Sequence, residues 1–176
     1  FVYTKNNKVY MYHVQYKWNK PIELPEGEKV HITQIKWSYK DNLFAVMYLD
    51  EVQKKLSIAM VNSETLIAKR VYTYTDKQFI SPDIASTILF LPENDNFVIL
   101  SDKDGYIHAY VYTQAGILKR QVGKGNFDVT KIYGYDAKNK LVYYQSTENG
   151  PLNRGVYAIG INDGKKRALA AHNGTN

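Results

Sequence analysis

Short strand-like segments, cut at regular intervals by turn residues, dominate the chain from Phe97 to Ile161. Segments rich in Tyr, Val and Ile alternate there with Asp-Gly, Lys-Gly, Lys-Asn and Asn-Gly pairs. Tyr and β-branched residues favour a pleated, half-buried surface, and the pairs between them favour turns. With 16 Tyr among 176 residues, the sequence predicts an all-β fold that is long enough for one sizeable core.

The strand-like segments recur in groups of four. Leu43–Leu49 is apolar throughout, as expected for an interior strand covered on both faces. In the next segment Leu56, Ile58 and Met60 alternate with other residues, which favours a strand nearer a rim. The second strands of successive groups begin near residues 43, 97 and 141. This period of roughly 40–50 residues is typical of four-stranded propeller blades. We therefore predict a partial β-propeller of about three four-stranded antiparallel blades plus part of a preceding blade.

The boundaries of the predicted blades follow from the turn residues. The outer strands of the incomplete blade take residues 1–26, and the blades take 27–76, 77–124 and 125–176. In the first part a strand begins almost at once, and Lys20–Leu24 is expected to be a short outer strand because Pro21 is tolerated only at a sheet edge. Ser81–Leu91 opens with a helix-capping Ser followed by Pro and Asp, so we predict a single helical turn there, with a strand only from Thr87 to Leu91.

Composition narrows the classes of partner. The formal net charge is +6, but its clusters are small and adjoin turns or strand ends, and no nucleic-acid-binding motif is present, so we expect no nucleic-acid partner. No apolar stretch approaches the roughly 18 residues of a membrane-spanning helix, so we expect no membrane span. Cysteine is absent, which excludes disulfides and thiolate metal sites without fixing the compartment. Because the sequence opens on Phe1 rather than Met, we expect both ends to be interior points of a longer polypeptide.

Catalytic motifs are missing from the sequence. It contains no G-x-S-x-G elbow, no H-E-x-x-H helix and no phosphate-binding glycine loop. The four histidines, His13, His31, His108 and His172, fall in separate repeats, so we expect each to pack in the core or on the surface. We accordingly predict no catalytic residue, no metal site and no cofactor.

The segment Asp102–Gly105 begins like a calcium-binding loop. The later ligand positions of such a loop would be Tyr106 and Thr113, so the match fails. We expect a tight hairpin at Asp104-Gly105 instead, since both residues tolerate the positive φ of such turns.

Several motifs resemble those of one known family. Ser101–His108 resembles the family's Ser-Glu-Arg-Asp-Gly-Tyr-x-His stretch, with Asp for Glu and Lys for Arg. Leu118–Thr130 resembles "LKRQ-x-T-x-G-x-W-x-V-T", with Gly for Thr at 123 and Phe for Trp at 127. Val142–Ser146, Pro151–Arg154 and Ile35–Trp37 extend the match. From about residue 30 to 172 the chain thus resembles the non-catalytic N-terminal propeller of bacterial dipeptidyl peptidase IV-type serine peptidases, in the prolyl oligopeptidase superfamily.

The resemblance implies both architecture and partners. In that family an eight-bladed propeller covers an α/β-hydrolase domain that carries a Ser-Asp-His triad, and an acidic pair grips the amino terminus of the peptide. For this chain it implies a non-catalytic scaffold and substrate gate, with the C-terminal hydrolase domain and peptide substrates as partners, in the periplasm, cell envelope or extracellular space. In relatives an aromatic residue before the Phe-Leu strand can border the substrate; Phe79 lies in a comparable connection, without a matching motif, and we predict a substrate-binding position there. Asp50-Glu51 stands where the family has Asn-Arg, so we expect solvated turn charges there rather than the acidic pair.

Two other functions remain open at this point. One is a stand-alone propeller that binds a glycan or a protein in the bacterial envelope, and the other is a related peptidase that releases tripeptides. A three-blade arc leaves its two end faces bare, so we also expect the chain by itself to self-associate.

Overall fold

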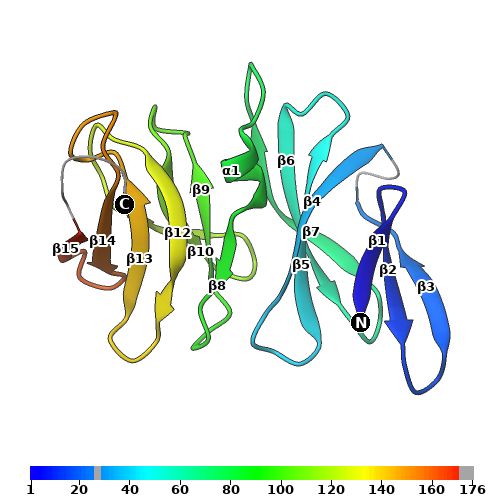
Figure 1. The fold of residues 1–176 in the computed structure, drawn as a ribbon. Coiled ribbons are helices and arrows are strands. Elements are labelled where there is room, and N and C mark those ends of the chain that lie inside the picture. Colours follow the sequence, from blue (N-terminus) through cyan, green and yellow to red (C-terminus); the bar gives the residue numbers. More distant parts are fainter. Residues whose placement is uncertain (26–28, 171–176) are drawn as a thin grey trace. The chain divides into compact units, whose positions relative to one another are not determined.

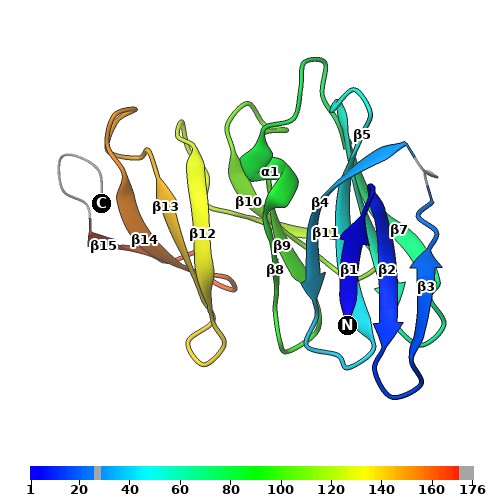
Figure 2. The same ribbon diagram turned by 45° about the vertical axis from the view of Figure 1, so that its right-hand side comes forward.

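A computed structural model describes residues 1–25 and 29–170, apart from the side chain of residue 170. The chain divides into two compact units, residues 1–86 and 87–176. Figures 1 and 2 show strands throughout both units, with one short helix among the described residues.

The first unit holds two antiparallel sheets and the helix. The three-stranded sheet has the order β1 (Val2–Lys5), β2 (Lys8–His13), β3 (Trp18–Ile22). The four-stranded sheet has the order β4 (Val30–Trp37), β5 (Leu43–Asp50), β6 (Lys55–Asn62), β7 (Ala68–Thr75). Helix α1 (Pro82–Ser86) follows β7.

One hydrophobic core joins these two sheets. Val9, Met11 and Ile22 of the three-stranded sheet cluster with residues of β5 and β6 that include Phe44 and Val61, all less than 9% exposed. Each sheet of the unit therefore covers apolar side chains of the other, which stabilises the pair through burial.

Three strand predictions have distinct outcomes. The segment 43–49 is buried at every position in β5, as expected for a strand covered on both faces. The strand with Leu56, Ile58 and Met60 lies nearer an edge than β5, as predicted, because β6 is next to the edge strand β7. Its burial does not alternate, however, because β6 is buried from residue 56 to 61. The positions between the three apolar residues are Ser57 and Ala59, whose small side chains are buried as well. The short outer strand runs over 18–22 rather than 20–24, with Pro21 on the edge strand β3.

The helical turn predicted after residue 81 is present as α1. The backbone N–H of Ile84 donates to the hydroxyl of Ser81 at 3.4 Å, which caps the first turn. Ile84 and Ala85 are buried. The hydroxyl of Thr33 in β4 donates to the carbonyl of Ala85, which fixes the helix to the neighbouring sheet.

The second unit holds two four-stranded antiparallel sheets. The first contains β8 (Ile88–Phe90), β9 (Phe97–Ser101), β10 (His108–Tyr112) and β11 (Leu118–Val122). The second contains β12 (Val129–Asp136), β13 (Leu141–Ser146), β14 (Gly155–Gly160) and β15 (Lys166–Ala170). Consecutive strands are neighbours in every sheet, which is the topology of a propeller blade. The chain is thus an all-β, partial β-propeller.

The connection between β9 and β10 differs from the tight hairpin expected at Asp104-Gly105. Ser101 pairs with His108, so the loop contains six residues rather than two. The N–H of Gly105 donates to the carbonyl of Asp102 at 2.8 Å, and only Gly105 of the predicted pair has a positive φ, 96°. In this loop the Asp104 carboxylate lies 3.0 Å from Nδ1 of His108.

Within the described residues, no helix has the length and apolar character required to cross a bilayer.

Candidate functional site

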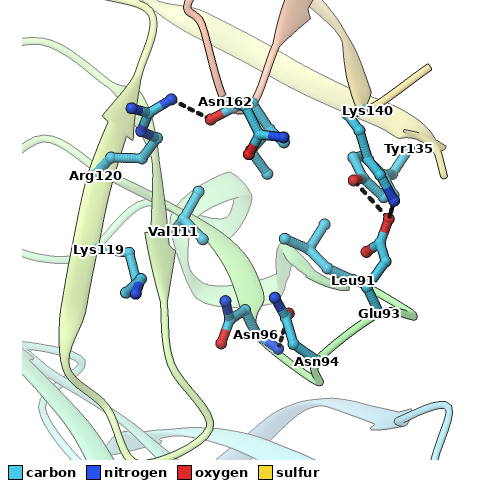
Figure 3. A pocket seen from close by; sticks show the side chains of 11 residues that line it. Leu91, Glu93, Asn94, Asn96, Val111, Lys119, Arg120, Tyr135, Lys140 and Asn162 are labelled. Atoms are coloured by element: carbon cyan, nitrogen blue, oxygen red, sulfur yellow. Dashed lines mark hydrogen bonds and ion pairs between the residues drawn. The ribbon is translucent and has the colours of Figure 1, made fainter. Parts of the chain in front are cut away.

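A groove lies between the two sheets of the second unit (Figure 3). It has a volume of about 470 Å³ and is lined by the β8–β9 turn, by β10, β11 and β12, and by the turns that follow β12 and β14. Leu91, Val111 and Ile161 contribute buried apolar surface to it, at 6% exposure or less. The volume falls within the usual range of small-ligand sites.

One wall of the groove carries a closed ion-pair network. The Glu93 carboxylate accepts a hydrogen bond from the Tyr135 hydroxyl at 2.9 Å and pairs with the ammonium group of Lys140. Burial opposes ionisation of Glu93, but the hydrogen bonds from Lys140 and Tyr135 outweigh it and lower the pKa of this carboxyl. Burial and the neighbouring Glu93 charge raise the pKa of Tyr135. Glu93 therefore stays ionised with its charge balanced by Lys140.

The opposite wall carries the guanidinium group of Arg120. Figure 3 shows this group directed across the groove toward the segment of Asn162, where it donates to the carbonyl of Ile161. Lys119 precedes it on β11. Three cationic side chains and one carboxylate line the groove, so its formal charge is 3 − 1 = +2.

A second polar cluster surrounds His108. Nδ1 of this buried ring lies 3.0 Å from Oδ2 of Asp104, and the amide of Gln121 donates to the same oxygen at 2.6 Å. The ring of Phe127 stands edge-on to the imidazole, with centroids 5.1 Å apart. Burial raises the pKa of Asp104, but hydrogen bonds from His108, Tyr110 and Gln121 lower it further than burial raises it. These contacts attach the 102–107 loop to the sheet, so the cluster stabilises the fold.

His13 and Asp50 have ordinary structural surroundings. His13 packs against the rings of Tyr16 and Trp18, and His172 lies outside the described residues. The Asp50 carboxylate accepts hydrogen bonds from the N–H groups of Lys54 and Lys55 at 2.7 and 2.9 Å, so it caps a turn.

Phe79 lies in the connection between β7 and α1 and is 64% exposed. Its neighbour Ile80 is buried, and the N–H of Ile80 donates to the carbonyl of Gln53 at 2.9 Å. The chain is therefore anchored immediately beside an outward-facing aromatic ring. Its role in substrate binding stays a prediction.

Sequence reasoning did not identify the groove in the second unit. Glu93, Arg120 and Lys140 come from three separate connections or strands, so no short spacing joins them. The one signal was the Leu-Lys-Arg-Gln stretch at 118–121, which includes Arg120 and Gln121.

No group of three or more His, Asp or Glu side chains with metal-site geometry occurs in the part of the chain that the structure describes.

Comparison with known proteins identifies relatives of this chain. The family model of the "Dipeptidyl peptidase IV (DPP IV) N-terminal region" matches residues 4–176. Dipeptidyl peptidase 4 of Porphyromonas gingivalis has a similar solved structure, with a TM-score of 0.87 and 32% identity over 96% of this chain and 24% of that chain. A putative dipeptidyl aminopeptidase IV of Bacteroides ovatus, 24% identical with a TM-score of 0.75, shares the fold over 90% of this chain and 25% of its own.

Curated relatives agree with this result. A probable dipeptidyl peptidase 4 of Aspergillus fumigatus is 23% identical over 144 residues, which are 79% of this chain and 19% of the relative. The chain thus spans about a fifth of the length of that relative.

The fold defines the structural class of this protein, which is a partial β-propeller built of blade-like sheets. Since the family match covers almost the whole sequence, the chain belongs to the dipeptidyl peptidase IV N-terminal region family.

Proposed function

We propose that residues 1–176 act as a non-catalytic scaffold and substrate gate in a dipeptidyl peptidase IV-like serine exopeptidase. The match of the N-terminal region over residues 4–176 is the observation that carries this proposal. By resemblance to this family, we assign the chemistry to an α/β-hydrolase domain C-terminal to this region of the parent protein; residues 1–176 themselves contain no nucleophile elbow.

The proposed division of labour has a physical basis. Strands buried on both faces, as β5 is, hold their positions rigidly and suit a wall that admits extended chains and excludes folded ones. An exopeptidase gains rate when a free amino terminus is held in register with the reacting groups. In this account residues 1–26 are outer strands of one blade, and 27–76, 77–124 and 125–176 are the next three. The parent protein works in the periplasm, cell envelope or extracellular space.

The full-length gene product tests the proposal. It should hydrolyse glycyl-prolyl-p-nitroanilide, and acetylation of the amino group should lower kcat/KM by about 100-fold or more, because the ammonium contact is lost. Preferred release of a tripeptide from matched substrates would instead assign a related peptidase. Failure to hydrolyse any such substrate would favour a binding propeller without peptidase activity.

A further inference from the structure

The inter-sheet groove of the second unit has a composition that suits a ligand. Its apolar residues Leu91, Val111 and Ile161 are buried, while Arg120 and Asn162 supply polar groups at its edge (Figure 3). Such a mixture of apolar surface and a few converging polar groups is typical of binding sites.

The charged side chains of the groove determine the sign of the charge on a ligand that would bind there. Lys140 already balances Glu93 on one wall, as the ion pair and the Tyr135 hydrogen bond show. Within the part of the chain that the structure describes, Arg120 donates one hydrogen bond, through Nη1 to the Ile161 carbonyl. A guanidinium group has five N–H donors, so this contact orients it without exhausting its donor capacity. The surplus of two positive charges favours an anion beside β11.

The chemistry of the walls narrows the class of anion. A planar guanidinium group matches the two oxygens of a carboxylate, and the carboxamides of Asn96 and Asn162 add neutral donors. Inorganic phosphate has no apolar part, whereas the groove also presents Leu91, Val111 and Ile161, so a carboxylate carried on an aliphatic stem is the better match. The buried apolar residues can cover the aliphatic part of a glutamate side chain.

We propose that this groove binds a carboxylate group, presented by a glutamate-containing peptide segment of a partner protein. The site uses Arg120 as the carboxylate anchor and Asn162 as a neighbouring donor. It does not depend on the proposed peptidase function, since no part of it requires hydrolysis.

Fluorescence anisotropy on the full-length gene product tests the proposal. The probe is a labelled, amino-acetylated peptide of alternating Gly and Glu with an amidated carboxyl end, compared with the same peptide carrying Gln. The acetyl group removes the free amino terminus, so binding is separated from exopeptidase recognition. We expect the Glu peptide to bind at least about tenfold more tightly than the Gln peptide, with affinity falling as salt rises.

Variants locate the binding. Arg120→Gln should weaken the Glu peptide about tenfold or more, whereas Arg167→Gln, on the equivalent outer strand β15 and outside the groove, should leave it unchanged. Asn162→Asp keeps the contact of Arg120 with the Ile161 carbonyl but adds a carboxylate, so it should weaken binding without loss of the native circular dichroism. Equal affinity of the Glu and Gln peptides, or unaltered binding in both groove variants, would overturn the proposal. Equally tight binding of free N-acetylglutamate would overturn the peptide as occupant.

Discussion

At the residue scale, single side chains in this molecule have well-defined surroundings. Asp104 is held by His108 and Gln121, whereas Phe79 projects into solvent beside the buried Ile80. The first arrangement stabilises a loop, and the second leaves a ring available for contact. Each makes a separate prediction.

Replacing Asp104 by Asn should reveal a pH-dependent contribution to stability. The pKa of Asp104 is lowered in the folded state, so ionisation favours folding above the ordinary Asp pKa, and this benefit is lost as the pH falls below about 4. Asp104→Asn should therefore lower the free energy of unfolding at pH 7 by the order of 1 kcal/mol, and by less at pH 3.5. Urea unfolding at both pH values measures this. Asp83→Asn controls for the loss of one carboxylate, and a deficit independent of pH would contradict the assignment.

Phe79→Ala tests the predicted substrate contact. If the ring borders the bound peptide, the variant of the full-length gene product should show a KM raised about threefold to tenfold, with kcat little changed, because lost uniform binding affects KM. Tyr39→Ala removes an aromatic ring of similar exposure, 63%, and serves as the matched control. Unchanged KM for Phe79→Ala would remove Phe79 from the substrate site.

At the element scale, strands and turns differ in how far the sequence determines them. The unbroken apolar run of β5 indicated its burial on both faces, and Ser81-Pro-Asp indicated α1. The loop after β9 was misread because local turn propensity does not reveal its six-residue length or the contact between Asp104 and His108 within it. The inter-sheet groove was missed for the same reason, since its residues meet only after two sheets pack.

Gly125 in the β11–β12 connection should tolerate no side chain. A Cβ at this position would lie 2.6 Å from Cε1 of Phe127, and the backbone φ is +155°. Gly125→Ala should cost about 3 kcal/mol or more, since overpacking adds to backbone strain. Gly164→Ala, with φ +70° but open space around it, should cost about 1–2 kcal/mol. Thermal or urea unfolding gives both values, and equal costs would contradict the predicted clash.

At the scale of the whole molecule, the all-β class and the blade topology could be predicted from the sequence, because strand-like segments and the turn residues between them recur with the period of a propeller blade. The family match over residues 4–176 places these sheets in the N-terminal region of dipeptidyl peptidase IV-type proteins. The proposed scaffold and gate role concerns the full-length protein.

The isolated 176-residue chain should self-associate. If each bare end face exposes about 400 Å² of apolar surface, roughly 10 kcal/mol of burial is forgone per face, which is comparable with the whole stability of a typical domain. Multi-angle light scattering at micromolar concentration should give a mass above that of one chain, falling on dilution. A stable monomer over this range would contradict the prediction.

The gate role is tested most directly by the size dependence of cleavage in the full-length gene product. Substrates would share one amino-terminal Gly-Pro sequence and range from a chromogenic dipeptide, through unstructured peptides, to a stably folded protein with the same terminus. A propeller gate predicts that kcat/KM persists for the peptides and falls by about 100-fold or more for the folded protein, a difference of roughly 2.7 kcal/mol in transition-state free energy. Equal kcat/KM for the peptides and the folded protein would contradict the account.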